Sequence, residues 1–162
     1  MERQQRGEKG WSTETVHPPP RREAAREIGA NTQVSGGDPR LNEAGGRPSF
    51  SLCRTSELQE GERRKFVVNG NEILLVKIDG EIFAVEPMCT HDGTDITRGK
   101  FDPVSGIIEC QKHFARFDIR TGIPLVGPFG ADGDTQPPLR LYKIRIENDH
   151  VHLEANQEWG VI

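Results

Sequence analysis

From Phe50 onward, short apolar runs are separated by turn residues, and this pattern predicts an all-β fold. The stretch KFVVNGNEILLVKIDGEIFAVE holds three such runs, divided by Asn69-Gly70 and by Asp79-Gly80. These dipeptides are strong signals for two-residue hairpin turns, because their residues tolerate the positive φ angles that such turns need. The run 73–78 is nearly continuous in apolar residues, as in a strand covered on both faces. We therefore expect three strands joined by two hairpins.

The rest of this part of the chain follows the same pattern. Residues 55–62 form at most one helical turn, and the runs RFDI and GIPLV flank a turn at 120–122. A Gly/Pro-rich loop covers 127–138, and residues 139–155 predict a closing hairpin whose first strand alternates imperfectly. The predicted fold class is a small β sandwich or barrel, interrupted by an excursion over about 88–128.

Residues 1–48 have a different composition. They contain six large apolar residues but twelve glycines and prolines. Such a segment cannot bury enough apolar surface to offset the entropy lost on ordering. We expect a disordered tail over 1–48 and one folded domain over 49–157.

Charge and apolar content exclude some classes of protein. Residues 49–162 carry thirteen Lys and Arg against eighteen Asp and Glu, and no basic stripe with interleaved aromatics is present, so a nucleic-acid partner is not expected. No run of eighteen apolar residues occurs, so no membrane span is expected. Without an export signal and with only three cysteines, the chain is expected in the cytoplasm.

The strongest chemical signal is CTHDGTDITRGKFDPVSGIIECQKH, which begins with Cys-x-His and ends with Cys-x-x-His. The candidate metal ligands are Cys89, His91, Cys110 and His113. Two thiolates and two imidazoles can bind one tetrahedral zinc ion. They can also bind a Rieske-type [2Fe-2S] cluster, in which imidazoles replace two thiolates at one iron. Each segment supplies one Cys and one His, whereas a Cys2His2 finger pairs Cys with Cys and His with His, and this spacing favours the cluster.

At these residues the chain resembles the Rieske ferredoxins, and the resemblance runs from Phe50 to about Glu154. GEIFAVEPMCTHDGTDI is similar to the first ligand segment of that family, and CQKHFARFDIRTG to the second. The resemblance implies that Cys89 and Cys110 bind the inner iron, that His91 and His113 bind the outer iron, and that the loop 127–138 covers the cluster. It further implies a soluble, monomeric one-electron carrier between a flavoprotein reductase that uses NAD(P)H and a terminal oxygenase, and not an enzyme in its own right.

The chain departs from the Rieske proteins of cytochrome complexes at several positions. Their bracing disulfide would fall at Thr94 and Lys112, so none can form here. Their Ser and Tyr hydroxyl donors are replaced by Ala115 and Phe117. Fewer donors to the cluster sulfurs leave the reduced state less stabilised, so we expect a potential near the bottom of the roughly −150 to +300 mV Rieske range. Glycine often follows the second His in the family, whereas Phe114 stands here. The resemblance implies that this favours the ferredoxins of ring-hydroxylating systems, which also have bulky residues at this place.

Other candidate groups have simpler interpretations. Cys53 is expected to be a buried structural cysteine, and His150 and His152 to lie on a solvated strand. Asp92 and Asp95 are expected to be solvated and to influence docking or potential. Two further hypotheses remain open, namely the small Rieske-like subunit of a nitrite reductase and a zinc-stapled binding module without redox activity.

Overall fold

The computed structural model describes residues 29–33 and 49–155, and the regular structure of these residues consists of strands and short 3₁₀ helices. The elements are β1 (Gly29–Gln33), β2 (Ser49–Arg54), η1 (Thr55–Glu57), β3 (Arg63–Val68), β4 (Asn71–Ile78), β5 (Glu81–Val85), β6 (Phe101–Asp102), β7 (Ile107–Glu109), β8 (Arg116–Asp118), β9 (Pro124–Val126), η2 (Pro128–Gly130), η3 (Gly133–Thr135), β10 (Ile144–Glu147) and β11 (His150–Glu154). The predicted all-β class and the single helical turn after β2 are confirmed.

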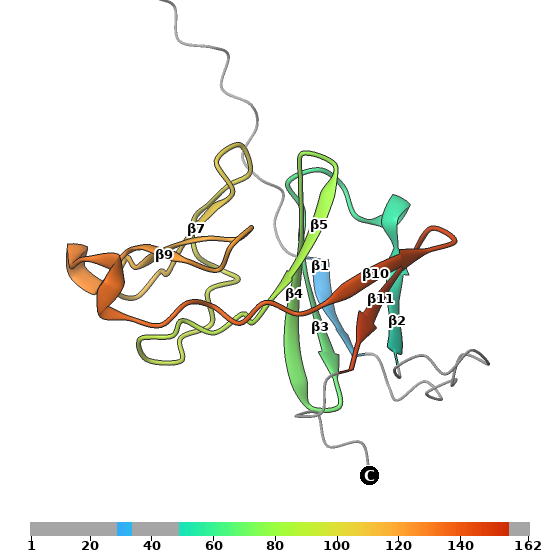
Figure 1. Cartoon of the computed structure of the whole chain (residues 1–162), viewed down its shortest axis with the longest axis horizontal. Helices are drawn as coiled ribbons and strands as arrows, with labels where there is room; N and C mark the ends of the chain where they lie inside the picture. Colours follow the sequence, from blue (N-terminus) through green and yellow to red (C-terminus); the bar gives the residue numbers. More distant parts are fainter. Residues whose placement is uncertain (1–28, 34–48, 156–162) are drawn as a thin grey trace, which may run out of the picture.

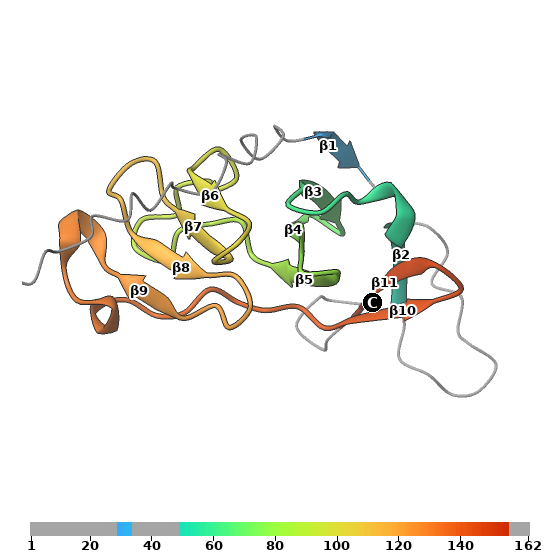
Figure 2. The same cartoon turned by 90° about the horizontal axis from the view of Figure 1, so that it is seen from above.

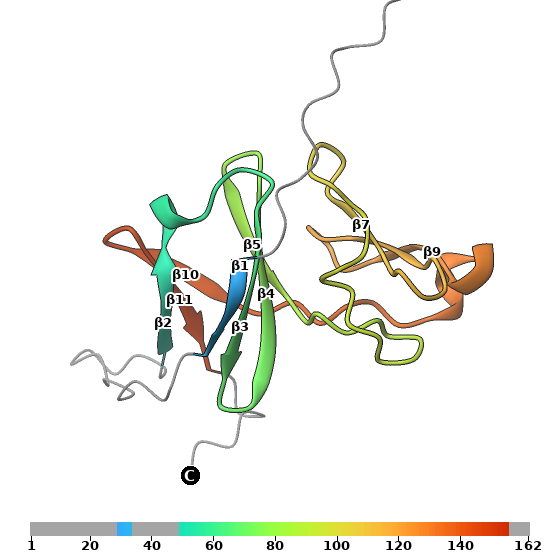
Figure 3. The ribbon, with the colours of Figure 1, turned by 180° about the vertical axis from the view of Figure 1, so that it is seen from behind.

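The strands form three sheets, in the orders β1-β3-β4-β5, β10-β11-β2 and β6-β7-β8-β9. Figures 1 and 3 show the first sheet between the other two. The first two sheets form a sandwich, and the third belongs to a separate lobe over residues 86–143, which we call the distal lobe (Figure 2). The predicted excursion over about 88–128 corresponds to this lobe, which in the structure also includes the loop that returns to β10.

Both predicted hairpins join β3, β4 and β5 in antiparallel register. Asn69 and Gly70 have φ angles of 49° and 78°, and Asp79 and Gly80 have φ angles of 54° and 80°. Positive φ at both central residues defines the turn type whose twist matches that of the flanking strands. Local turn chemistry therefore sets the register of this sheet.

Strand β4 is buried on both faces, which explains its nearly continuous apolar sequence. Ile73 and Leu75 belong to the core between the two sandwich sheets, with Phe66 and Val151. The residues that alternate with them belong to a second core inside the distal lobe, namely Leu74, Val76 and Ile78. One strand therefore supports both halves of the molecule.

The closing hairpin is shorter than predicted. Strand β10 begins at Ile144, and β11 pairs with both β10 and β2. Leu139 instead lies in the core of the distal lobe, where its amide donates to the Gly122 carbonyl at 2.9 Å. Leu141 forms an isolated bridge to Val85. The imperfect alternation of this segment reflects a chain that crosses from one lobe to the other before it joins a sheet.

Buried and polar contacts fix the distal lobe on the sandwich. Arg120 Nη2 lies 2.7 Å from Asp79 Oδ2 in the β4–β5 turn. Arg63 of β3 is buried, and its Nη1 donates to the Gly99 carbonyl at 2.9 Å. These arginines join the first sheet to two different loops of the lobe.

One element lies inside the segment predicted to be disordered. Strand β1 pairs in parallel with the edge strand β3, with Gly29 opposite Arg64 and Gln33 opposite Val67. The disordered tail over 1–48 stays a prediction: residues 29–33 form this strand, and the remainder of the segment lies outside the described residues. No helix in the described ranges has the length and apolar character needed to cross a membrane.

Candidate metal centre

The first candidate segment, residues 89–94, forms a tight loop at the start of the distal lobe. The Cys89 amide donates to the Thr94 carbonyl at 2.8 Å, and the Gly93 amide donates to the Cys89 carbonyl at 2.8 Å. Gly93 has a φ of 73°, which a residue without Cβ adopts at little cost. These bonds turn the chain sharply between Cys89 and Thr94, with His91 near the tip.

The second segment, residues 110–115, repeats this arrangement. The Cys110 amide donates to the Ala115 carbonyl at 2.8 Å, and the Phe114 amide donates to the Cys110 carbonyl at 3.0 Å. Phe114 has a φ of 63°, so it occupies the position that Gly93 has in the first loop. The two cysteines are therefore equivalent in backbone structure, although one motif has one intervening residue and the other has two.

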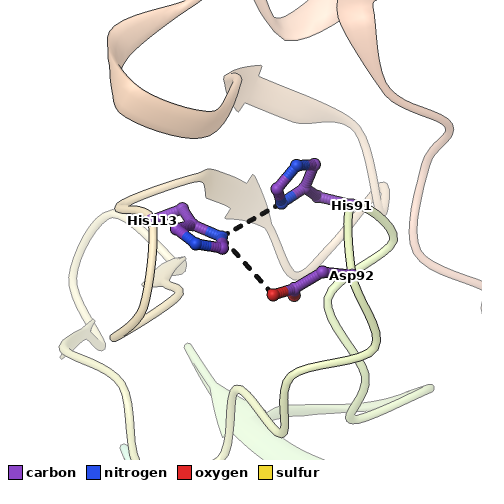
Figure 4. A group of neighbouring side chains, drawn as sticks. All are labelled: His91, Asp92 and His113. Carbon is purple, nitrogen blue, oxygen red and sulfur yellow. Dashed lines mark hydrogen bonds and ion pairs between the residues drawn. The ribbon is translucent and has the colours of Figure 1, made fainter.

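The two histidines point their side chains at the same space (Figure 4). The Nδ1 atoms of His91 and His113 lie 3.1 Å apart, and the rings meet edge to face with centroids 4.8 Å apart. Bonds from imidazole nitrogen to a metal such as zinc are about 2.0–2.1 Å long, so two nitrogens at this separation can bind the same ion. The side chain of His91 is exposed and that of His113 is partly buried.

The two cysteines lie in the core of the distal lobe. Cys89 and Cys110 are 1% and 0% exposed. Burial raises the pKa of the Cys89 thiol to about 11, and the neighbouring Cys110 adds to this effect, whereas the His91 backbone amide opposes it. A thiolate at this position needs a compensating cation, and a bound metal ion is the strongest one that a protein can supply.

Asp92 connects the two loops, and sequence reasoning missed this role. Its Oδ2 lies 2.8 Å from Lys112 Nζ and 3.4 Å from His113 Nδ1, and its Oδ1 accepts from the Thr94 amide at 3.1 Å. The hydrogen bond from Lys112 is the largest cause that holds the pKa of Asp92 well below its usual range. Asp92 and the two histidines resemble a set of two His and one carboxylate for a single metal. The Asp92 carboxylate is however already neutralised by Lys112.

Asp95 is also held by a lysine, and its side chain, predicted to be solvated, is partly buried. Lys65 Nζ of β3 lies 3.0 Å from both Asp95 Oδ2 and Glu72 Oε1. Partial burial raises the pKa of Asp95, but hydrogen bonds from Thr97 and Lys65 outweigh this effect, so the net pKa is lowered. Lys65 and Asp95 are thirty residues apart along the chain, and no local sequence signal indicates that they meet.

The loop 127–138 contacts both ligand segments. The Phe129 amide donates to the His113 carbonyl at 2.7 Å, and the two rings pack with centroids 4.7 Å apart. Thr90, between Cys89 and His91, donates its hydroxyl to the Pro137 carbonyl at 2.7 Å. The loop that was predicted to cover the cluster thus contacts both segments that carry the candidate ligands.

The other residues singled out in the sequence lie partly in the sandwich and partly in the core of the distal lobe. Cys53 is buried in the sandwich core, where burial raises the pKa of its thiol. His150 and His152 are neighbours on β11 with ring centroids 6.3 Å apart. Ala115 and Phe117 are fully buried in the core that contains Cys89 and Cys110, and neither offers a hydroxyl.

The four candidate ligands form two pairs at different depths in the distal lobe. Two buried thiols lie together, and two imidazole nitrogens converge closer to the surface. A Rieske-type [2Fe-2S] cluster requires this separation, because one iron takes two thiolates and the other takes two imidazoles. The residues therefore fit such a cluster.

Comparison with known proteins agrees with this geometry. The chain matches the Rieske [2Fe-2S] domain family over residues 49–132, and it belongs to that family. It is 35% identical over 98 residues to the ferredoxin component of the naphthalene 1,2-dioxygenase/salicylate 5-hydroxylase systems of a Ralstonia species, which covers 60% of this chain and 86% of the relative. It is 31% identical over 107 residues to the 3-phenylpropionate/cinnamic acid dioxygenase ferredoxin subunit of Photorhabdus laumondii, covering 66% of this chain and 94% of the relative.

A solved structure shows the same fold. The ferredoxin of carbazole 1,9a-dioxygenase from Nocardioides aromaticivorans IC177 superposes with a TM-score of 0.57 at 25% identity, covering 67% of this chain and 98% of that protein. The predicted family, fold class and [2Fe-2S] cofactor are confirmed. The same holds for the prediction of an electron-transfer component in place of an enzyme. The cofactor of this family does not support the hypothesis of a zinc-stapled module.

Proposed function

We propose that the chain is a one-electron carrier in which Cys89 and Cys110 bind one iron of the cluster and His91 and His113 bind the other. The observation that carries this assignment is the convergence of the two Nδ1 atoms at 3.1 Å, next to two thiols that are almost fully buried. The matching backbone hydrogen bonds of the two loops support it, because they present the cysteines as an equivalent pair.

The residues of the site have separate roles in this proposal. When bound, the cluster supplies one-electron chemistry. Cys89 and Cys110 hold the inner side within the apolar core, where water is excluded. His91 and His113 hold the outer side, and the exposed His91 ring gives the shortest path to a docked protein. Phe129 packs on the His113 ring and limits the access of water to it.

We infer the partners from the relatives. Those named above are ferredoxin components or subunits of dioxygenase systems, and one related solved structure is a complex of reduced oxygenase and oxidized ferredoxin in carbazole 1,9a-dioxygenase. By this analogy the chain accepts electrons from a flavoprotein reductase that uses NAD(P)H, passes them to a terminal oxygenase, and acts as a monomer in the cytoplasm. The names of the relatives support a ferredoxin more than the small subunit of a nitrite reductase.

The metal assignment is tested on purified protein and on cysteine variants. We expect the intact chain to contain iron and acid-labile sulfide in equal amounts, and to give a rhombic electron-spin resonance signal after reduction. Cys89→Ser and Cys110→Ser should each abolish this signal, whereas Cys53→Ser is the matched control and should retain it. A signal that survives both ligand substitutions would contradict the proposed ligand set.

The histidine assignment has a test of its own. We expect His113→Cys to retain part of the cluster but to lower its reduction potential, because an added thiolate favours ferric iron. His152→Cys is the control, since it places the same change on β11 in the sandwich. An unchanged potential in a cluster-containing His113→Cys variant would show that His113 is not a ligand.

A further inference from the structure

A lysine of the second loop reaches an aspartate of the first. Lys112 Nζ and Asp92 Oδ2 are 2.8 Å apart, and the Asp92 side chain is only 18% exposed. The other oxygen of Asp92 accepts from the Thr94 amide within its own loop at 3.1 Å. One carboxylate therefore fixes the turn of the first loop and binds the side chain of the second.

This pair differs from the other direct contacts between residues 89–94 and 110–115. The remaining polar contacts that join these two described segments involve His91, His113 or the two thiols, which are proposed to bind metal. All three described cysteines are free, so no disulfide joins the loops. Once the four ligands are engaged, Asp92 and Lys112 form the polar link that remains.

We propose that Asp92 and Lys112 are positioning residues that hold the two loops closed around the cluster, an inference that rests on the ligand set proposed above. A partly exposed ion pair contributes little to global stability. Release of the cluster, in contrast, requires only that two short loops separate, and local opening of this kind depends on local contacts. The pair therefore controls how fast the cluster is lost, and has little effect on the unfolding of the whole chain.

The test compares Asp92→Asn, Lys112→Met and the double variant. Asparagine at position 92 retains an acceptor for the Thr94 amide, so this change keeps the turn of the first loop and removes the negative charge that faces Lys112 and His113. Lys100→Met is the matched control, because Lys100 lies in the same lobe, is 88% exposed, and is 3.8 Å from a glutamate that Arg116 binds at 2.7 Å. The readouts are the rate of cluster loss to a ferrous chelator and the reduction potential.

The proposal predicts how the rate of cluster loss and the reduction potential change in each variant. Both single variants should lose the cluster roughly twofold to fivefold faster than the wild type. The double variant should be no faster than either single variant, since the shared contact is already gone. The potential should move in opposite directions, down when the cation is removed and up when the anion is removed. A purely electrostatic role would instead move the release rates in opposite directions, and that result would overturn the proposal.

Two further measurements complete the test. High ionic strength should speed cluster loss in the wild type but not in Lys112→Met, and Lys112→Arg should restore slow loss. If Asp92→Asn and Lys112→Met release the cluster at the rates of the wild type and of Lys100→Met, the proposed positioning role of Asp92 and Lys112 is overturned. The proposed function is left intact by that result. Wild-type protein isolated without iron and sulfide would overturn the proposed function itself.

Discussion

Two phenylalanines beside His113 have backbone conformations that favour glycine. Phe114 and Phe129 have φ angles of 63° and 56°, and their side chains are 54% and 74% exposed. A non-glycine residue in this region costs roughly 1–2 kcal/mol. Both conformations are imposed by hydrogen bonds, since the Phe114 amide binds the Cys110 carbonyl and the Phe129 amide binds the His113 carbonyl. The site thus retains strain at two residues that bury little of their own surface.

Replacing Phe114 by glycine should remove one of these strains. We expect Phe114→Gly to raise the free energy of unfolding by about 1 kcal/mol, because the half-exposed ring contributes little burial and the backbone no longer resists its φ. The measurement is the midpoint of chemical denaturation of the cluster-containing protein. Phe114→Ala is the control, since it removes the ring and retains the strain, and it should give no such gain. Equal midpoints for the glycine and alanine variants would contradict this explanation.

The apolar residues around the thiols should keep the reduction potential low. Ala115 is fully buried in the core with both cysteines. We expect Ala115→Ser to raise the potential, because a hydroxyl donor near the cluster sulfurs stabilises the added electron. A redox titration monitored by absorbance measures this change. Ala131→Ser, in the exposed part of the covering loop, is the control and should leave the potential unchanged.

At the scale of elements, β4 contributes most of the buried strand residues that the two cores have in common, and the adjacent β5 adds Ala84 to one core and Val85 to the other. Leu74 and Leu75 are adjacent and both are 0% exposed, but Leu74 faces the distal lobe and Leu75 faces the sandwich. Adjacent residues of a strand point to opposite faces, so these two leucines probe the two cores from one place in the chain.

Truncating each leucine should distinguish the contributions of the two cores to stability and to cluster retention. Leu74→Ala and Leu75→Ala should each cost about 2–5 kcal/mol of stability, as expected for a cavity in a close-packed core. Only Leu74→Ala should also speed the loss of the cluster under native conditions, because it loosens the core that contains Cys89 and Cys110. Each variant serves as the control for the other. Equal effects on cluster loss would show that the two cores do not act separately.

The contact of β3 with the end of the first loop has a consequence at low pH. The pKa of Asp95 is lowered in the folded protein, so its contribution to stability is present above the ordinary value near 3.9 and is lost as the pH falls through the folded pKa. We expect Asp95→Asn to lose stability less steeply than the wild type below about pH 4. At neutral pH the variant should be less stable by about 1 kcal/mol, a value limited by solvent screening of a partly exposed pair.

Denaturation midpoints at several pH values test this prediction. Asp134→Asn, at an exposed position of η3, is the control and should follow the wild-type curve. Parallel acid limbs for wild type and Asp95→Asn would show that Asp95 has no part in acid unfolding.

Elements set by local chemistry could be predicted from the sequence, whereas those set by distant contacts could not. The turns at Asn69-Gly70 and Asp79-Gly80 were predicted because the dipeptides themselves favour positive φ. Strand β1 was missed because GANTQ carries no apolar alternation, and its place is set by pairing with the edge of β3. The short strands β6 and β7 were not predicted, since each is too brief to show a period.

The same distinction holds for the candidate site. The four proposed ligands could be found from their spacing, and the structure brings the two histidines together and the two cysteines together. The roles of Asp92 and Asp95 could not be found, because Lys112 and Lys65 lie far from them in the sequence. A ligand motif shows which residues can bind a metal, but the residues that support it are defined by the fold.

At the scale of the whole molecule, the chain consists of a sandwich and a distal lobe on either side of one sheet. The proposed ligands all lie in the distal lobe, and residues 49–162 carry five more acidic than basic residues. Complementary charge raises association rates more than it raises affinity. This arrangement suits the proposed electron carrier, which would bind two partners briefly and in turn.

Strand β4 has one further consequence for the exchange of electrons. The two faces of β4 are packed into different cores. A movement of β4 in the core that contains the cysteines would therefore also disturb the packing of the sandwich. A redox centre works fastest when its surroundings rearrange little as the charge changes, since preorganised groups need not be reoriented at each transfer. Because β4 packs in both cores, the sandwich restricts movement of the residues that would hold the cluster.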